Sequence, residues 1–501
     1  MKHVKCATYE GIEAKVVEVE SSLTKGLPSF NIVGIASTSI NESKERVKSA
    51  LLTSNYTFPP KRFVISLTPS DLKKQGSHFD LSIALLLLMD SEEIDISEWF
   101  VFGELSLDGK VRENGYLYPL ILSLANQQLI TKAIVPKESL EKLTKIANVE
   151  FYGVSHINEA LEILKDTSDQ FAPSQSSAII HKYITTQEPL YFHSEYKYDF
   201  KDVKGQSIAK RAALISAAGF HNILLEGSPG CGKSMIAQRL RHILPPLSTA
   251  DILDIAKLQA LDGYEPDFIP LRPFRSPHHT STTASIFGGG SHNAKIGEVG
   301  LSHNGILFFD ELPHYSKNIL EALREPLQDN QIRISRVNSK VEYPASFLFV
   351  SAMNPCPCGN LLDTSKECRC SELEIQRYKN RLSDPFLDRI DLHVTMQNVT
   401  LSDTSDVTST QLHSKVLRTI EFIAARGQKS FNGKMDDEEV EKYCTMNDEA
   451  KESLENAVHR FSLSFRAIKK VQKVARTIAD LDQSQMIRKK DVLEALSYRR
   501  R

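Results

Sequence analysis

The fold of the central part of this chain is decided by one stretch, Ile223-Leu224-Leu225-Glu226-Gly227-Ser228-Pro229-Gly230-Cys231-Gly232-Lys233-Ser234. Its last eight residues fit the pattern G-x-x-x-x-G-K-[S/T], and the apolar run before them predicts a short strand. A helical pattern with Met235, Ile236 and Leu240 begins directly after the motif. A strand, a glycine-rich loop and a helix in this order form a phosphate-binding loop, whereas a chance glycine-rich turn would lack this context.

The residue types in the loop explain what it would bind. Glycines let backbone N–H groups turn toward phosphate oxygens, and the helix N-terminus adds a partial positive charge. Lys233 would reach the β- and γ-phosphates, and Ser234 would bind Mg²⁺. We therefore expect ATP and Mg²⁺ to bind at Gly227, Ser228, Pro229, Gly230, Cys231, Gly232, Lys233, Ser234 and one further acidic residue, Asp310.

That acidic residue belongs to a second apolar run, Ile306-Leu307-Phe308-Phe309-Asp310-Glu311. The run predicts a buried strand that ends in two carboxylates. Asp310 would hold Mg²⁺, and Glu311 would polarise the attacking water. A strand that ends in ordinary surface acids is the alternative, and the pairing with a phosphate-binding loop argues against it.

Two further polar residues are candidates for the hydrolysis step. A third apolar run, residues 347–353, ends at Asn354, whose side chain would orient the lytic water. Pro355 follows, so a turn-forming asparagine is the alternative. Arg389 would stabilise phosphoryl-transfer charge on a neighbouring subunit. An ion pair within the chain, with Asp388 or Asp391, explains Arg389 equally well.

Four of the seven cysteines are gathered in one short segment, as Cys356-x-Cys358 and Cys368-x-Cys370. Four thiolates suit a tetrahedral structural Zn²⁺ site. The C-x-C spacing is less common than C-x-x-C, which makes the pattern less specific. Reduced free thiols and a redox pair are the alternatives, and we expect a structural zinc site.

The other candidate metal ligands are weaker. Cys6, Cys231 and Cys444 have no partner nearby in the sequence, and seven cysteines in 501 residues do not suggest a disulfide scaffold. His278 and His279 lie next to each other in a polar segment, where histidines are more often solvated than bound to metal. We therefore expect no second metal site.

Composition and charge limit the class of protein. The chain has 501 residues, which corresponds to about three domains, and its 41% hydrophobic and 25% charged residues are typical of globular proteins. The formal net charge is −2, so nucleic acid would have to bind local basic patches. No apolar run is long enough to span a bilayer, and the N-terminus lacks the apolar core of a signal peptide. We expect a cytoplasmic enzyme with no membrane partner.

The pattern along the chain predicts three domains and a linker. Residues 1–165 are mixed α/β, and residues 166–195 read as a linker rich in Ser, Thr and Pro. Strands and helices alternate over residues 196–398, as in a parallel sheet that binds a nucleotide at its strand ends. Residues 399–501 are helical and would form a lid. Within the first domain we expect strands at 14–19, 63–67, 100–102 and 133–135, and helices at 40–52 and 81–88.

The ATP-site segments, together with Leu387-Asp388-Arg389, resemble AAA+ ATPases of the magnesium-chelatase/MCM-like branch. A closer resemblance, to the YifB/ComM family, covers nearly the whole chain. It is carried by Asp202-Val203-Lys204-Gly205-Gln206, Arg275-Ser276-Pro277-His278-His279, Asn354-Pro355-Cys356-Pro357-Cys358-Gly359 and Arg476-Thr477-Ile478-Ala479-Asp480-Leu481. The resemblance implies an α/β P-loop AAA+ module with a helical lid, and a homo-oligomeric, hexameric ring. Some family members are DNA helicases that drive branch migration during natural transformation.

The resemblance also implies roles for single residues. Arg389 is similar to an arginine finger. Ser464-Phe465-Arg466 is similar to the second sensor of the lid, which would make Arg466 a γ-phosphate contact; a helix-surface cation is the alternative. The segment around Gln206 would contact adenine, and the resemblance supports metal binding by the four cysteines.

Two predicted hairpins are candidates for DNA contact. Residues 331–343 alternate and turn at Asn338-Ser339, where related ATPases carry a pore hairpin, and Arg333, Arg336 and Lys340 would track phosphates. Residues 286–300 resemble the helix-interrupting hairpin of this branch. A solvated charged hairpin is the alternative. The C-terminus is rich in cations that would meet phosphate, nucleotide or a neighbouring subunit: Arg460, Arg466, Lys469, Lys470, Lys473, Arg476, Arg488, Lys489, Lys490, Arg499, Arg500 and Arg501.

The N-terminal domain resembles the Lon-protease domain, an α+β fold of the ribosomal S5 domain 2-like type. The resemblance is carried by residues 69–77 and 103–111. The nucleophile pattern G-P-S-A-G is replaced by Gly76-Ser77-His78-Phe79-Asp80, and no lysine follows Gly115 where the base is expected. We therefore expect a degenerate domain without proteolysis, although Ser77 with Lys73 or Lys74 remains an alternative.

An ATP-driven DNA helicase of recombination or natural transformation is the function that these features favour. A metal-chelatase motor subunit is the first rival, but such subunits resemble only the central and C-terminal parts of this chain. An ATP-dependent protease is disfavoured by the missing Ser-Lys pair, and a protein-remodelling AAA+ ATPase remains open.

Overall fold

A computed structural model gives the fold in two compact units. One contains residues 1–180, 256–268 and 335–342; the other contains residues 181–255, 269–334 and 343–501. Among the described residues, no helix is both long enough and apolar enough to cross a membrane. The structure describes residues 2–10, 13–24, 29–33, 38–54, 56, 62–72, 74, 76–89, 95–115, 117–165, 182–185, 189–264, 266, 268–289, 295–335, 340–363, 366–399, 403–405 and 407–499.

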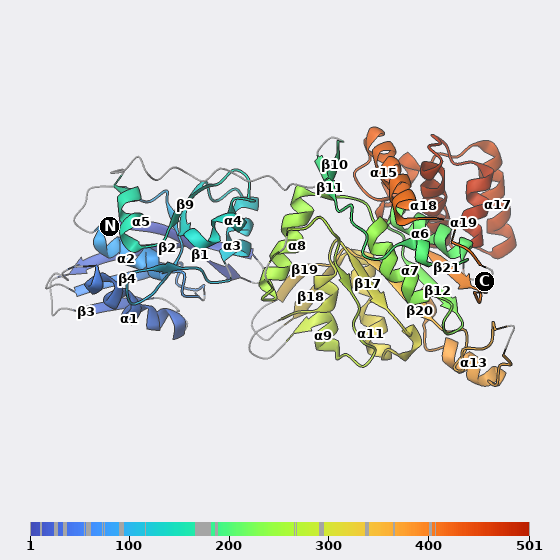
Figure 1. Ribbon diagram of the computed structural model, residues 1–501, viewed down its shortest axis with the longest axis horizontal. Coiled ribbons are helices and arrows are strands. Elements are labelled where there is room, and N and C mark those ends of the chain that lie inside the picture. Colours follow the sequence, from blue (N-terminus) through green and yellow to red (C-terminus); the bar gives the residue numbers. More distant parts are fainter. Residues whose placement is uncertain are drawn as a thin grey trace. The chain divides into compact units, whose positions relative to one another are not determined.

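The N-terminal part of the first unit, blue to teal in Figure 1, contains a mixed seven-stranded sheet. A long antiparallel pair, β1 with β2, lies at its centre, and β5, β8 and β9 add to it in parallel. In spatial order the strands are β3 (Ser29–Val33), β4 (Arg62–Thr68), β2 (Glu13–Thr24), β1 (Lys2–Glu10), β5 (Phe100–Val101), β8 (Lys132–Pro136) and β9 (Glu150–Val154). The four strands predicted for this region are confirmed.

The helices of the first unit bury apolar side chains. The apolar run at residues 81–88 forms α2, and every residue of that helix but Leu88 is buried. Both predicted helices, at 40–52 and 81–88, are confirmed. The helices are α1 (Thr38–Thr53), α2 (Asp80–Leu88), α3 (Leu117–Asn126), α4 (Leu140–Leu143) and α5 (Ile157–Leu164), and a small extra sheet pairs β6 (Glu104–Leu105) with β7 (Val111–Arg112).

The region similar to a protease site contains no Ser-Lys pair among the described residues. The Ser77 hydroxyl donates to the Glu104 carboxylate, and Asn114 Nδ2 lies 3.5 Å from Ser77 Oγ. The Lys74 amine donates to the carbonyl of Pro69, and burial lowers its pKa. Lys73 lies outside the described residues. The geometry thus gives Ser77 a carboxylate neighbour where a Lon-type site has an amine.

A five-stranded, all-parallel sheet forms the centre of the second unit. Alternate residues of the three inner strands enter two different hydrophobic cores: Ile223 and Leu225 pack into one, and Leu224 into the other. Such two-sided burial explains why the strands read as unbroken apolar runs. In spatial order they are β14 (Phe274–Arg275), β17 (Ile306–Phe309), β20 (Leu348–Met353), β12 (Ile223–Gly227) and β21 (Leu392–Met396).

Helices flank this sheet on both faces, which confirms the α/β AAA+ module. One core holds α6, α7 and most of the C-terminal helices; the other holds α9 to α12 and α14. Along the chain, the helices before the lid are α6 (Ser207–Gly219), α7 (Lys233–Leu240), α8 (Thr249–Leu261), α9 (Thr283–Phe287), α10 (Glu298–Leu301), α11 (Lys317–Ala322), α12 (Arg324–Asp329), α13 (Glu372–Lys379) and α14 (Asp384–Leu387). A separate small sheet joins β10 (Lys182–Thr185), β11 (Pro189–Phe192) and β13 (Leu247–Ser248).

The C-terminal residues form the helical lid, orange to red in Figure 1. Its inner helix α18 is strongly amphipathic and packs on α6, α15 and α19. The core cluster that contains β12 also contains Val471, Val474 and Ile478 of α18, so lid and sheet are packed together. The lid helices are α15 (Ser409–Ala425), α16 (Asp437–Tyr443), α17 (Asp448–Phe461), α18 (Phe465–Leu481) and α19 (Lys489–Ser497).

Both predicted hairpins contain paired strands. β15 (Gly288–Gly289) pairs antiparallel with β16 (Lys295–Ile296) between α9 and α10, and β18 (Gln331–Ser335) forms a two-stranded sheet with β19 (Lys340–Pro344). Arg333 is exposed on β18. Arg336 and the turn at Asn338-Ser339 lie outside the described residues. So does most of the expected linker, residues 166–181 and 186–188, as well as Arg500 and Arg501.

Candidate functional site

The three strands that carry the predicted ATP-site residues are neighbours in the sheet. β20 lies between β17 and β12, and all three run parallel. Their carboxyl ends therefore meet at one edge, where the loop at residues 227–234, Asp310 and Asn354 follow the three strands. Crevices at this edge of an open α/β sheet are where ligands usually bind.

Side chains from the three strand ends contact each other directly. Lys233 Nζ lies 3.0 Å from Asn354 Oδ1 and also donates to the carbonyls of Gly227, at 2.7 Å, and Ser228, at 3.0 Å. Ser234 Oγ donates to Asp310 Oδ2 at 2.8 Å. Burial lowers the pKa of Lys233, and the nearby carboxylates of Asp310 and Glu311 oppose that shift. The Lys233 amine therefore lies between two loop carbonyls and the amide oxygen of Asn354, and a bound anion could take the place of these three oxygens as its partner.

The loop backbone has the open shape that a polyphosphate needs. Gly230 and Gly232 have φ values of +82° and +96°, which favour glycine, and no atom lies within 4 Å of the position a Cβ would take at either residue. α7 begins at Lys233, so its N-terminal N–H groups open into the same space. The Ser234 and Asp310 oxygens are hard ligands of the kind that Mg²⁺ prefers. The residues present therefore fit ATP with Mg²⁺.

Glu311 is held apart from this network. Its backbone has a left-handed φ of +51°, and its side chain is 53% exposed, with Oε2 lying 3.5 Å from His279 Nδ1. His279 stacks near His278, with ring centroids 4.2 Å apart, and the neighbouring Tyr315 hydroxyl donates to the carbonyl of Pro277. The predictions did not include this His279 contact. The one sequence signal was the segment Arg275-Ser276-Pro277-His278-His279 itself.

Arg389 lies at the opposite edge of the sheet. Asn222, which precedes β12, donates through Nδ2 to the Arg389 carbonyl at 2.9 Å. β12 separates Asn222 from the phosphate-binding loop, and its five residues span about 16 Å at roughly 3.3 Å per residue. An arginine side chain is shorter than that distance. Arg389 instead donates to Gln328 Oε1 at 2.9 Å and to the carbonyl of Pro385 at 2.5 Å. Among the described residues it makes no hydrogen bond or ion pair with the phosphate-binding loop of its own chain.

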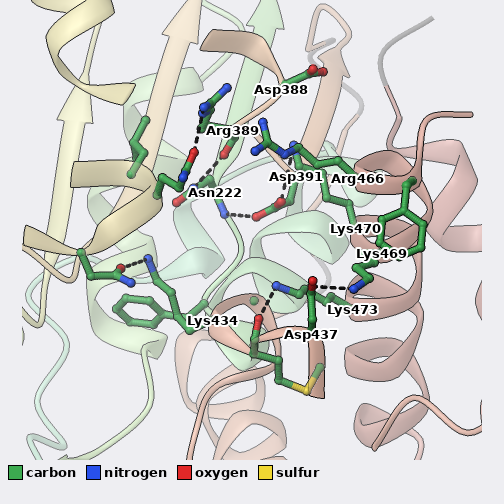
Figure 2. A pocket seen from close by; sticks show the side chains of 17 residues that line it. Asn222, Asp388, Arg389, Asp391, Lys434, Asp437, Arg466, Lys469, Lys470 and Lys473 are labelled. Atoms are coloured by element: carbon green, nitrogen blue, oxygen red, sulfur yellow. Dashed lines mark hydrogen bonds and ion pairs between the residues drawn. The ribbon is translucent and has the colours of Figure 1, made fainter. Parts of the chain in front are cut away.

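Arg466 lies beside Arg389, in the pocket shown in Figure 2. The cavity has a volume of about 400 Å³ and is lined by elements from both the sheet edge and the lid. Its cations outnumber its acids. The cations are Arg389, Lys434, Arg466, Lys469, Lys470 and Lys473, and the acids are Asp388, Asp391 and Asp437.

Two of the three acids of this basic pocket are already paired. Asp391 accepts from the backbone N–H of Asn222 at 3.0 Å and lies 3.9 Å from Lys470 Nζ, while Asp437 pairs with Lys469 at 2.6 Å. Lys434 instead donates to a carbonyl and an amide oxygen. Burial lowers the pKa of Arg389, and the neighbouring charge of Arg466 lowers it further. The pocket therefore carries surplus positive charge, which an anion would relieve.

The four cysteines form a tight cluster on the loop between β20 and α13. Their sulfurs all lie within 4.8 Å of one another, with Cys356–Cys358 at 3.4 Å and both Cys356–Cys368 and Cys358–Cys368 at 3.7 Å. These separations exceed a disulfide bond of about 2.05 Å. Zn–S bonds of about 2.3 Å place tetrahedral sulfurs roughly 3.8 Å apart. The donor set therefore fits a tetrahedral Zn²⁺ centre.

Backbone N–H groups around the cluster favour thiolates. Those of Asn360 and Arg369 are directed at Cys358 and lower its thiol pKa to about 6. At Cys370 the backbone of Cys358 also lowers the pKa, but burial and the neighbouring sulfurs of Cys358 and Cys356 outweigh it and raise the pKa to about 12. Only a cation would let all four sulfurs ionise together. This is the one group of three or more close metal-ligating side chains within the described residues, so His278 and His279 belong to none.

Family models match most of the chain. The model described as magnesium chelatase, subunit ChlI, matches residues 199–404; those described as subunit ChlI of Mg-chelatase and magnesium chelatase, subunit ChlI C-terminal, match residues 19–139 and 406–499. The match over residues 19–139 contradicts the expectation that a metal-chelatase subunit resembles only the central and C-terminal parts of this chain. The chain is 37% identical to the competence protein ComM of Haemophilus influenzae over 499 residues, 98% of this chain and 95% of ComM. The chain belongs to the YifB/ComM family of magnesium-chelatase-like AAA+ ATPases.

Other relatives extend this result. The YifB protein of Escherichia coli is 36% identical over 503 residues, 98% of this chain and 95% of YifB. A shorter match, 38% identical over 86 residues, covers 17% of this chain and 18% of the DNA repair protein RadA of Aquifex aeolicus. The YifB/ComM resemblance read from the motifs is therefore confirmed, as is the AAA+ fold class.

Several C-terminal cations are bound within the lid of this YifB/ComM chain. Arg476 is fully buried and, with Arg426, pairs with the buried Asp480 at 2.9 and 2.5 Å. Arg488 and Lys490 both pair with Asp482 at 2.7 Å. The sequence shows cations without showing which of them are paired inside the fold. Some of the C-terminal cations are therefore ion-paired within the lid, and others line the basic pocket.

Proposed function

We propose that this protein is an ATP-hydrolysing ring motor, a hexamer in the cytoplasm, that acts on single-stranded or branched DNA as a helicase promoting branch migration. One observation carries the proposal: the two halves of an ATP site lie on opposite edges of one sheet. Lys233, Ser234, Asp310 and Asn354 meet at one edge, and Arg389 lies at the other. A chain built this way completes its sites by joining copies head to tail.

At the loop edge, each polar residue has a role in ATP binding or hydrolysis. Lys233 exchanges its carbonyl and Asn354 partners for the β- and γ-phosphates. Ser234 and Asp310 hold Mg²⁺, which supplies charge neutralisation at the phosphate oxygens. Glu311 leaves His279 to polarise the attacking water, and Asn354 orients that water.

At the opposite edge, Arg389 and Arg466 act on the ATP of the neighbouring subunit. Both line one pocket, so both would approach the neighbour's γ-phosphate together. An arginine supplied by a partner stabilises charge in the transition state and is worth about 10³–10⁵ in rate. Hydrolysis would then depend on ring assembly.

DNA contact is assigned to the paired hairpins, β18–β19 above all. Arg333 is exposed on β18, and Arg336 and Lys340 belong to the same segment. Backbone phosphates are tracked by such cations with strong salt dependence. The names of two relatives, competence protein ComM and DNA repair protein RadA, support a DNA substrate.

The four cysteines are assigned a structural Zn²⁺. The sulfur separations and the N–H groups directed at Cys358 support this metal. Zinc here would close the loop between Asn354 and α13 without taking part in the reaction.

The deciding experiment is the ATPase rate of the full chain with no DNA, single-stranded DNA and branched DNA, beside Lys233→Ala. We expect hydrolysis that rises with DNA and is lost in the variant. Replacing Arg333 and Arg336 by Ala should weaken DNA binding and flatten its salt dependence. Hydrolysis without any effect or binding of DNA would reject the DNA motor in favour of a motor on a protein partner.

A further inference from the structure

The cysteine cluster rests directly against the phosphate-binding loop. Gly359 follows Cys358, and its N–H donates to the carbonyl of Cys356 at 3.0 Å, which closes the turn. A Cβ at Gly359 would lie 2.5 Å from Pro229 Cδ and 2.7 Å from Pro229 Cγ. Its φ is +80°, so glycine is required here for its backbone angle and also for the close approach to Pro229.

The helix that follows the cluster contacts the same site from its other end. Ser371, the residue after Cys370, caps the N-terminus of α13, which begins at Glu372. In its last turn, Lys379 Nζ pairs with Glu226 at 3.2 Å, next to the loop. Burial raises the pKa of Tyr378 to about 12, and the nearby backbone of Asn354 opposes that shift, so the Tyr378 hydroxyl lies close to Asn354. The segment from Cys356 to Lys379 therefore braces the ATP site at Pro229, Glu226 and Asn354.

We propose that Gly359 is a positioning residue of the ATP site, and that the metal state of the four cysteines sets the affinity for ATP. This inference rests on the proposed ATP site. Gly359 presses on Pro229 and holds the loop in the shape that directs its N–H groups at phosphate. A bound metal fixes the turn that carries Gly359; without the metal, the turn loosens and the brace is lost. Gly359 itself touches no reacting atom.

The test compares two glycine variants of the full chain. Gly359→Ala adds a Cβ against Pro229, whereas Gly427→Ala adds one at a similar φ of +76° with no atom within 4 Å. The Kd for a fluorescent ATP analogue with Mg²⁺ should rise roughly tenfold in Gly359→Ala, equal to about 1.4 kcal/mol, and stay unchanged in Gly427→Ala. Equal Kd values in the two variants would overturn the proposal.

A second substitution isolates the contact. Pro229→Ala removes Cγ and Cδ, so the double variant Gly359→Ala/Pro229→Ala should lose less affinity than the sum of the single variants. Additive losses would count against a direct contact. Should Gly359→Ala fail to fold, Lys379→Ala trims only a partly exposed side chain and should raise the Kd by about twofold. No change in that variant would also reject the brace.

Metal removal tests the second part of the proposal, that the metal state of the four cysteines sets the affinity for ATP. Metal content and analogue Kd are measured before and after chelation, and again after Zn²⁺ is restored. We expect the Kd to rise when the metal leaves and to recover with it. An unchanged Kd, or protein that never holds metal, overturns this half. Wild-type protein that binds no analogue in any state would instead contradict the proposed ATP site itself.

Discussion

The two edges of the ATPase sheet differ in how their charges are satisfied. At the loop edge, Lys233 and Ser234 already have hydrogen-bond partners within the chain, Asn354 and Asp310. At the opposite edge, cations outnumber acids, and burial together with the charge of Arg466 lowers the pKa of Arg389. The loop edge has internal partners for its polar groups, whereas the surplus of positive charge at the other edge calls for a ligand. This difference indicates that one chain carries two separate parts of the proposed ATP site: one edge binds the nucleotide, and the other supplies positive charge to a neighbouring subunit.

The largest expected effect comes from breaking each edge separately. Lys233→Ala and Arg389→Ala should each lower the ATPase rate by about 10³ or more, because each leaves every site of the ring with one defective half. Lys233→Ala should also lose ATP binding, while Arg389→Ala should keep it. Steady-state hydrolysis and analogue binding separate the two.

Mixing the two variants sharpens this result. A mixed ring contains some interfaces that join an intact loop edge to an intact Arg389, so hydrolysis should partly recover. No recovery, in mixtures shown to co-assemble, would mean that Arg389 acts within its own chain or only through Gln328.

The next effect concerns the lid helix that carries Arg466. Asp480 is buried and pairs with both Arg426 and Arg476, so Asp480→Asn would leave buried positive charge without compensation. Loss of one partner of a buried ion pair costs about 3–5 kcal/mol. Denaturant unfolding should show this loss of stability. The exposed control Asp448→Asn, at the start of α17, should show almost none.

A smaller effect is expected for Arg466 itself. A hydrogen bond to a charged group is worth about 1.5–3 kcal/mol, so Arg466→Ala should lower kcat by roughly 10- to 100-fold. Stability should not change, since the side chain is exposed. A change in KM alone would place Arg466 in binding and weaken the idea that it acts with Arg389.

The sequence predicted the loop edge better than the opposite edge. Residues at the ends of parallel strands are brought together by the sheet whatever their side chains are, so Asp310 and Asn354 could be placed beside Lys233 from their position alone. The positions of residues 227–234 could also be predicted, because the sequence motif itself specifies the local structure of the loop. The strands that we predicted in the two large sheets could likewise be located from their apolar runs alone.

The opposite edge depends on tertiary packing that no local pattern encodes. Two roles were open for Arg389 from the sequence, a neighbouring site or an ion pair with Asp388 or Asp391. In the structure Asp391 is hydrogen-bonded to Asn222 and lies near Lys470 instead. His279 beside Glu311, and Gly359 against Pro229, join segments far apart in the chain. A sequence shows the residue types at such sites but not which of them meet.

The last effect is a pH dependence at the basic pocket. Burial lowers the pKa of Lys434 to about 8, with Asp391 opposing the shift and Lys473 adding to it. An unfolded lysine has a pKa of about 10.4, so between these values the unfolded chain binds more protons and stability rises with pH. Lys434→Met removes this term. The variant's free energy of unfolding, relative to wild type, should therefore fall steadily between about pH 8 and 10.

The exposed residue Lys415 provides the matched control for this measurement. Lys415→Met should change stability by the same small amount at every pH, because its side chain stays in solvent in both states. If Lys434→Met and Lys415→Met gave parallel pH profiles, the Lys434 amine would be solvated and the pocket less strained by charge than its geometry indicates. Saturating the pocket with pyrophosphate offers a second check, since an anion beside Lys434 and Lys473 favours their protonated forms and should flatten the wild-type profile.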